Sequence, residues 1–261
     1  MLLKIKNSLF AIFLSMTLLS CATVVEPPRL APGAPGAPHD AWARVLDTAV
    51  DERGRVDFAQ IARAPHDLHL YLDYVATVSP TSHPERFPTR ADRLAYYMNS
   101  YNALAMHGII AHGIPADFQS FFDRAAFFKF TAFRVGGRSI SLYDYENDVI
   151  RPLDEPRVHF ALNCMSIGCP RLPQTPFRAD QLENQLDSAT REFFNSAKYV
   201  QVDPAQRLVR LSEILDFYPE DFVNKRHAPS LIAYANRYRL DAIPEDFGVG
   251  FIPYDWTVAR Q

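Results

Sequence analysis

The segment from Arg157 to Leu172 holds the side chains best suited to covalent chemistry. It reads RVHFALNCMSIGCPRL and contains one histidine and two cysteines. A cysteine attacks its substrate as a thiolate, and it needs a nearby base or positive charge to become one near neutral pH. The residue types therefore predict a thiol site, with Cys169 as the nucleophile and His159 as its base.

Polar and apolar residues alternate over positions 157–163, which predicts a β-strand. On a strand, Arg157, His159 and Asn163 share a polar face that we expect to line a solvated site. The other face is apolar and ends at Cys164. This pattern makes Cys164 a buried thiol that faces away from His159.

The next residues, Gly168-Cys169-Pro170, predict an irregular loop at the end of that strand. Proline disfavours a helical conformation at the residue before it, and glycine allows a sharp turn. A loop of this kind can present Cys169 to a substrate. Arg157 and Arg171 are close enough in sequence to add a positive field.

Three other roles for these residues stay open at this point. Cys164 and Cys169 could form a structural disulfide, which the oxidising environment of an exported protein permits. His159, Cys164 and Cys169 could instead bind zinc, although H-x4-C-x4-C spacing matches no common zinc site and no fourth ligand is evident. Both thiols could also be inert. We predict no metal and no cofactor.

Two asparagines, Asn99 and Asn102, lie one turn apart on a helix predicted over residues 89–112. Thr89 is its expected N-cap, with Asp92 completing a capping box. Buried amides must be hydrogen-bonded. These two either hold loops against the helix, or one of them orients His159 or stabilises an oxyanion.

A second group of candidates surrounds these asparagines. Glu146 is a candidate third catalytic member beside Asn99 and Asn102, and we expect it to form an ion pair with Arg151 near the site. Tyr101 is a supporting residue, with Arg157, Asn163 and Cys164. Asp255 and Trp256 are candidates for packing beneath the site.

The N-terminus has the pattern of a lipoprotein signal. Residues 1–20 combine two early lysines with an apolar run, as in a secretory signal, and Cys21 follows Leu18-Leu19-Ser20. This predicts lipid attachment at Cys21, and Ala22 rather than Asp at the next position favours the outer membrane. Residues 21–40 are rich in Pro and Gly and predict a tether. Residues 41–261 are then one globular domain facing the periplasm.

The composition restricts the class of protein. Of 261 residues, 48% are hydrophobic and 22% are charged, which excludes wholesale disorder. A formal net charge of −3 gives no basis for nucleic-acid binding. Helical periodicity alternates with two predicted hairpins, at residues 130–142 and 199–211. The sequence therefore predicts an α+β domain with a small, mostly antiparallel sheet.

Five stretches, taken together, resemble family 547 of the domains of unknown function. They are residues 96–103, 141–151, 157–170, 211–222 and 254–256, within a resemblance that spans about residues 45–258. The family occurs in exported bacterial proteins and in some eukaryotic multidomain proteins. Its pattern includes positions matched here by Asn99, Asn102, Glu146, Arg157, His159, Cys164, Cys169 and Pro170.

The resemblance carries over no established activity. Fusion of some eukaryotic members to a glutaredoxin-like domain implies thiol chemistry by association. A Cys, a His and an amide or acid also suggest a distant papain- or transglutaminase-like hydrolase. In those enzymes the cysteine begins a helix, whereas Pro170, Pro173 and Pro176 keep this chain irregular after Cys169.

These observations predict an envelope lipoprotein that acts through Cys169 and His159. It would be a thiol-dependent hydrolase or transferase, and its substrate an amide- or thiol-containing component of the envelope. The alternative is a non-catalytic periplasmic binding or assembly module, in which Cys164 and Cys169 form a structural disulfide. Its expected partners are the membrane, through the lipid, and an envelope substrate or protein.

Overall fold

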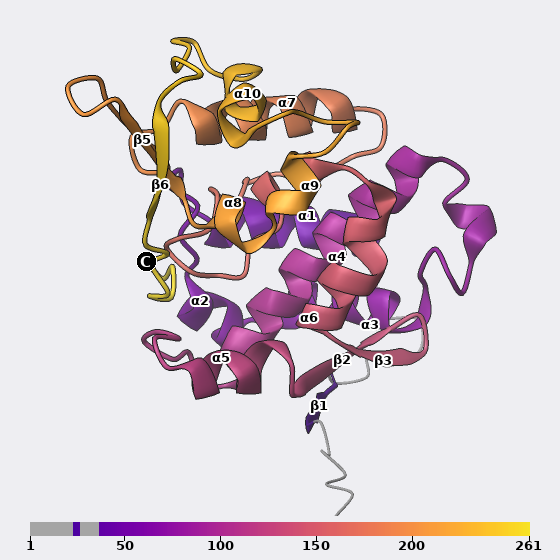
Figure 1. Ribbon diagram of the computed structural model, residues 1–261. Helices are drawn as coiled ribbons and strands as arrows, with labels where there is room; N and C mark the ends of the chain where they lie inside the picture. The colour runs from indigo at the N-terminus through magenta and orange to yellow at the C-terminus, as the bar shows by residue number, and fades with distance from the viewer. Residues whose placement is uncertain (1–22, 27–36) are drawn as a thin grey trace, which may run out of the picture.

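The computed structural model describes residues 23–26 and 37–261. The predicted signal peptide, Cys21 and most of the predicted tether lie outside these residues. The described part has the predicted α+β fold (Figure 1). Its longer helices are α1 (Pro38–Ala49), α2 (Phe58–Arg63), α3 (His66–Thr77), α4 (Arg90–Ala111), α5 (Phe121–Phe128), α7 (Leu182–Phe194) and α10 (Leu231–Asn236).

Shorter helical segments connect these elements. They are α6 (Leu142–Asp144), α8 (Ile214–Phe217) and α9 (Pro219–Phe222), the 3-10 helices η1 (Pro84–Arg86), η3 (Arg151–Leu153) and η4 (Pro156–Phe160), and the π-helix η2 (Tyr145–Ile150). None of the helices within the described residues is long and apolar enough to cross a membrane.

The domain has two lobes, each built around its own hydrophobic core. Helix α4 runs through the core of the larger lobe. It begins as predicted, because the Thr89 side chain accepts from the backbone N–H of Asp92 and the Asp92 carboxylate accepts from the N–H of Thr89. Its residues from Leu94 to Ile109 are all buried. Side chains of α1, α3 and α7 complete this first core. The central part of the helix, which carries Asn99 and Asn102, is therefore enclosed by the surrounding elements.

Both predicted hairpins are present. Strands β2 (Thr131–Val135) and β3 (Arg138–Ser141) are antiparallel, as are β4 (Val200–Asp203) and β5 (Leu208–Ser212). Gly136 and Gly137 both have positive φ, at 55° and 84°, as a primed hairpin turn requires.

The small sheet of the predicted fold is divided into two, and each part is mixed rather than mostly antiparallel. There are two three-stranded sheets, in the orders β1-β2-β3 and β4-β5-β6. Each gains a parallel edge strand from a distant part of the chain, β1 (Thr23–Val25) in the first and β6 (Gly248–Ile252) in the second. Strand β1 belongs to the predicted tether, so the chain is held against β2 before it reaches α1.

A second core lies in the smaller lobe, around α7, β4–β6 and α8–α10, with α7 and α10 at the top of Figure 1. The two cores meet at η4. Val158 is buried in the first core, whereas Phe160 is buried in the second. The strand predicted over residues 157–163 is therefore wrong. Its alternating apolar residues do not share one face, because η4 sends them into different cores.

Candidate functional site

A cavity of about 340 Å³ opens between the two lobes. Cys164, Cys169, His159, Glu146 and Tyr101 all line it. The structure thus brings together most of the residues predicted for chemistry. The rest of the wall is largely aromatic and includes Phe121, Phe128, Tyr143, Phe217, Tyr218, Tyr254 and Trp256.

The two thiols are in contact with each other in the wall of this cavity. Both are free, and their Sγ atoms lie 2.9 Å apart. The Tyr254 hydroxyl lies 3.2 Å from Cys164 Sγ and 2.9 Å from Cys169 Sγ. The backbone N–H of Cys164 also donates to Cys169 Sγ. The prediction that Cys164 faces away from the site is wrong, because no strand places it on the opposite face from His159.

The surroundings of the two thiols differ. Hydrogen bonding to the Cys169 thiol, supported by Ser166 and Tyr254, lowers the pKa of Cys164 to about 7. Burial and the neighbouring Cys164 raise the pKa of Cys169 well above its ordinary value. Cys164 is also the more exposed thiol, since Cys169 is only 3% exposed. Exposure and hydrogen bonding therefore both favour the thiolate form at Cys164 over Cys169.

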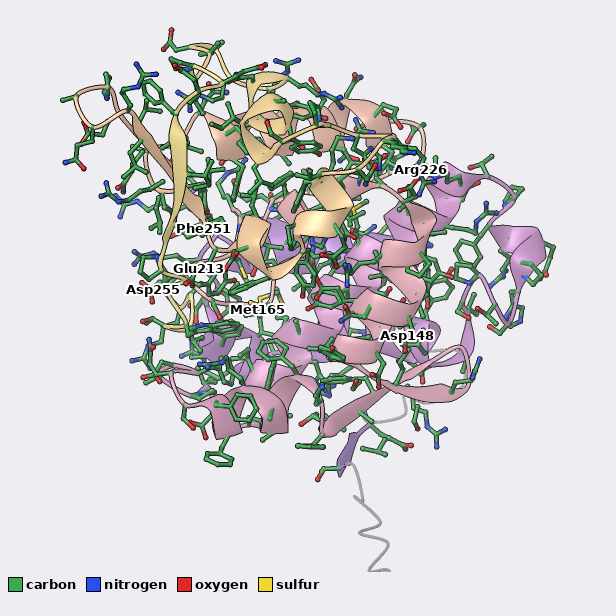
Figure 2. All side chains as sticks on the ribbon, in the orientation of Figure 1. Asp148, Met165, Glu213, Arg226, Phe251 and Asp255 are labelled. Atoms are coloured by element: carbon green, nitrogen blue, oxygen red, sulfur yellow. The ribbon has the colours of Figure 1, made fainter. Side chains whose placement is uncertain are left out.

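Amide side chains connect α4 to the loop that carries the cysteines. Asn102 Oδ1 accepts from the backbone N–H of Asn163, and its Nδ2 donates to the Ala161 carbonyl. Asn163 Oδ1 in turn accepts from the N–H of Met165, and its Nδ2 donates to the Pro170 carbonyl. These bonds stabilise the left-handed conformation of Met165, whose φ is 68° (labelled in Figure 2). Asn102 and Asn163 therefore shape the loop.

Asn99 acts on a different loop. Its amide accepts from the backbone N–H of Phe177 and donates to the carbonyl of the same residue, and it also accepts from Trp42 Nε1. Asn99 and Asn102 are not among the residues that line the cavity. Their contacts favour the loop-holding alternative over a role at a reacting atom.

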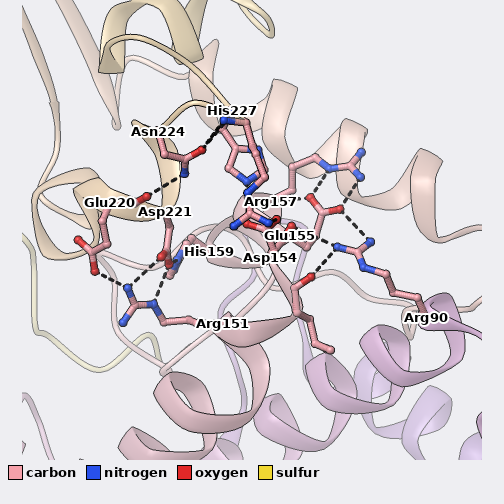
Figure 3. A network of polar contacts seen from close by, with 12 residues as sticks. Arg90, Arg151, Asp154, Glu155, Arg157, His159, Glu220, Asp221, Asn224 and His227 are labelled. Atoms are coloured by element: carbon pink, nitrogen blue, oxygen red, sulfur yellow. Dashed lines mark hydrogen bonds and ion pairs between the residues drawn. The ribbon is translucent and has the colours of Figure 1, made fainter.

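His159 is oriented by a carboxylate that the residue pattern did not indicate, that of Asp221. Its Nε2 lies 2.7 Å from Asp221 Oδ2, and its ring stacks on Tyr218 with centroids 4.5 Å apart. Arg151 holds Asp221 through two hydrogen bonds (Figure 3). Burial acts to raise the pKa of Asp221, but the bonds with His159 and Arg151 dominate and lower it to about 2.

The other ring nitrogen of His159 faces the cavity carboxylate. Nδ1 lies 3.8 Å from Glu146 Oε1, and the Tyr101 hydroxyl donates to Glu146 Oε2. The predicted Glu146–Arg151 ion pair is wrong, because Arg151 binds Asp221 and Glu220 of α9 instead. Glu146 is thereby left to interact with His159 and Tyr101 inside the cavity.

The two arginines expected to supply a positive field to the thiols are directed elsewhere. Arg157 binds Glu155 at 2.7 Å, in the network of Figure 3, and it binds Glu183 at 2.8 Å. Arg171 binds Glu192. Arg157 does not line the cavity and instead braces η4. In residues 23–26 and 37–261, no group of three or more His, Cys, Asp or Glu side chains is arranged to hold a metal ion.

Tyr254 and Asp221 are functional candidates that residue types alone did not reveal. Both lie in stretches used for the family resemblance, 254–256 and 211–222, but each is far in sequence from the residue it contacts. Asp255, expected beneath the site, has its backbone carbonyl bonded to the N–H of Gly168, and Trp256 lines the cavity (Asp255 is labelled in Figure 2).

Gly168 allows Tyr254 to reach the thiols. A Cβ atom at this position would lie 2.8 Å from two ring carbons of Tyr254 and 2.9 Å from the backbone nitrogen of Asp255. We expect Gly168→Ala to displace the Tyr254 hydroxyl from both sulfurs, raise the pKa of Cys164, and lower the free energy of unfolding by about 1–3 kcal/mol. Denaturant unfolding and the pH dependence of Cys164 alkylation measure the two effects.

Gly250→Ala in β6 is the matched control, because a Cβ there finds its nearest neighbour at an ordinary 3.7 Å. It should leave the pKa of Cys164 unchanged. An unaltered alkylation profile in Gly168→Ala would mean that Tyr254 does not tune the thiols.

Comparison with known proteins adds a family to this geometry. Residues 85–194 match the family described as "Protein of unknown function, DUF547". No curated protein and no solved structure matches the chain. The matched range includes α4, Glu146, His159 and both cysteines, and it ends before Asp221 and Tyr254. The central part of this chain is therefore similar to that family, which supports the predicted resemblance over residues 85–194 of its predicted span of about 45–258.

Proposed function

We propose that the protein is a thiol-dependent acyl-transfer enzyme, a hydrolase or transferase, with Cys164 as its nucleophile. The observation that carries the proposal is the shared cavity. A partly exposed thiol, held by three hydrogen-bonding partners, opens into the same space as an imidazole oriented by a carboxylate. A Cys, His and Asp in these roles are a recurrent solution for acyl transfer.

The first step forms an acyl-enzyme. The Cys164 thiolate attacks the carbonyl carbon of an amide or ester, so that an S–C bond forms and the bond to the leaving amine or alcohol breaks. The departing group needs a proton, which His159 Nδ1 delivers from its imidazolium form. Asp221 stabilises that imidazolium through Nε2, and Arg151 keeps Asp221 in place.

The second step regenerates the thiolate. Water attacks the acyl carbon in a hydrolase, and an amine or thiol attacks it in a transferase. His159 Nδ1 takes the proton of the attacking group while the S–C bond breaks. The thiol of Cys169 and the hydroxyl of Tyr254 stabilise the returning Cys164 thiolate. No oxidant or cofactor is needed, and the expected substrate remains an amide- or thiol-containing envelope component.

The chromogenic ester p-nitrophenyl acetate tests this chemistry without the natural substrate. The full chain should release p-nitrophenol in a stoichiometric burst and gain one acetyl group on Cys164, detected by mass spectrometry. Cys164→Ser should lose the burst and Cys169→Ala should keep it. The Asp221→Asn protein should still gain an acetyl group on Cys164 but should lose it more slowly than the native protein, so that the acetylated form accumulates. Acetylation elsewhere, or a burst that survives Cys164→Ser, would refute the proposal.

One observation favours a second candidate, a non-catalytic module with a structural Cys164–Cys169 disulfide. The two sulfurs are 2.9 Å apart and need only a small approach to bond. Protein isolated without reductant would then label at neither cysteine until reductant is added. The reduced protein would also gain no acetyl group from p-nitrophenyl acetate. Labelling of Cys164 without added reductant excludes this candidate.

We also propose that the protein is a lipid-anchored lipoprotein of the outer membrane, with its domain in the periplasm. The support is the residue pattern around Cys21, which includes the basic and apolar residues before it and the Leu18-Leu19-Ser20 run. Metabolic labelling with a radioactive fatty acid should mark the native chain and not a Cys21→Ser chain. A native chain without label would exclude the anchor.

A further inference from the structure

Strand β1 fixes where the chain enters the domain. Thr23 pairs with Thr131 of β2, and the Thr23 backbone N–H donates to the carbonyl of Phe130 at 3.0 Å. Cys21 precedes Thr23 by two residues, a span of at most about 7 Å. The inference below rests on the proposed lipid anchor. If Cys21 carries the lipid, the surface around Phe130 must lie at the bilayer.

That surface is unusually apolar. Phe121, Phe122 and Phe130 have exposed fractions of 70%, 81% and 51%. Phe121 and Phe122 begin α5, and Phe130 follows its end, where its backbone N–H donates to the Ala125 carbonyl. Figure 1 places α5 and β1 at the same end of the molecule. We call Phe121, Phe122, Lys129 and Phe130 the α5 face.

The residue types of the α5 face match a lipid surface. Aromatic rings favour the interfacial zone of a bilayer, where an apolar side chain meets polar head groups. The Lys129 ammonium lies over the Tyr143 ring at the edge of this face, where it can meet an anionic head group. Asp123 on α5 partly offsets its charge, so the rings should provide most of the affinity, with a weak dependence on salt.

We propose that the α5 face docks on the bilayer to which Cys21 is anchored. The lipid anchor then acts with a second, non-covalent contact on the same bilayer. Phe121 also lines the cavity that contains the thiols. Docking therefore sets the opening of the candidate site against the lipid surface and gives it access to acyl groups held in the membrane.

Fluorescence quenching tests the orientation directly. The full chain carrying Phe122→Trp is mixed with vesicles of phosphatidylethanolamine and phosphatidylglycerol whose acyl chains are brominated. The fluorescence added by the introduced indole should be quenched. Leu240→Trp is the matched control, because Leu240 is 85% exposed but follows α10 in the other lobe, and its added fluorescence should be unchanged. Equal quenching of the two variants, or no quenching of either, overturns the proposal.

Vesicle flotation measures the contribution to affinity. In a Cys21→Ser chain, the double substitution Phe121→Ser and Phe122→Ser should lower the vesicle partition coefficient by about tenfold. The reason is the loss of two rings that are partly inserted into the bilayer. Leu240→Ser should not lower the coefficient. All three chains keep the same residues 1–20, so any binding of that segment to the vesicles contributes equally to each partition coefficient. If the Cys21→Ser chain is a dimer and the double substitution makes it a monomer without altering vesicle binding, the α5 face is a contact between two copies of the chain. The docking proposal then fails.

These readouts are independent of the thiol chemistry. Cys164→Ser should leave quenching and flotation unchanged, so failure of the acyl-transfer proposal would not alter them. If Cys21 is found without lipid and the Phe122→Trp chain is still quenched, the anchor proposal fails and the docking proposal stands. A lipidated Cys21 without quenching in that chain would overturn docking alone.

Discussion

Iodoacetamide should alkylate Cys164 of the native protein with a midpoint near pH 7, and Cys169→Ala should move that midpoint upward. The thiolate is the reacting species, so the alkylation rate rises as pH increases through the pKa of the thiol. Hydrogen bonding to Cys169 is the largest influence that lowers the pKa of Cys164, to about 7. Without it, the midpoint should approach the ordinary value of about 8.5.

The measurement is the rate of alkylation from about pH 5 to about pH 10, a range that includes both expected midpoints. Mass spectrometry follows each cysteine separately. Tyr254→Phe should shift the midpoint in the same direction by less, because only a secondary hydrogen bond is lost. In Cys164→Ala, Cys169 should remain slow to react below pH 8.5, since burial raises its pKa. Preferential alkylation of Cys169 in the native protein would return the nucleophile to the residue that the sequence favoured.

Asn102→Ala should destabilise the protein by about 2–5 kcal/mol, which is the second large effect we expect. The substitution leaves two buried backbone groups unpaired, the N–H of Asn163 and the carbonyl of Ala161. It also releases the start of the cysteine loop. The alkylation midpoint of Cys164 should therefore rise together with the loss of stability.

Asn236→Ala is the matched control for this experiment. The Asn236 amide makes the same kind of paired contact, with the backbone N–H and carbonyl of Ile243, but in the other lobe. Its removal should lower the free energy of unfolding while the alkylation midpoint of Cys164 stays near pH 7. If Asn102→Ala leaves the midpoint unchanged, the α4 amide supports the fold and has no influence on the thiols.

Short-range signals predicted several elements correctly. Helix α4 begins at its capping box, and the β2–β3 hairpin turns at two glycines with positive φ. The β4–β5 hairpin likewise forms within the predicted residues 199–211, apart from Ser212 at its end. In each case the stabilising interaction joins residues within one or two turns, so the sequence of that segment contains the information. The sequence also placed Cys169 and His159 at one site, although it directed Cys164 away from His159.

The arrangement of that site was decided by tertiary structure. The alternation over residues 157–163 is equally compatible with a strand and with η4, and only the presence of a core on either side of η4 selects the helix. Asp221 lies 62 residues from His159, and Tyr254 lies 85 residues from Cys169. The parallel strands β1 and β6 likewise pair with distant segments.

The sequence by itself therefore determined which segment carries the thiols and which helix supports it. Tertiary structure decided which thiol is exposed, which carboxylate orients His159, and where the cavity opens. The physical reason is that a pKa depends on burial and on charges within a few ångströms. Those neighbours come from elements that are far apart along the chain and meet only when the two lobes pack together.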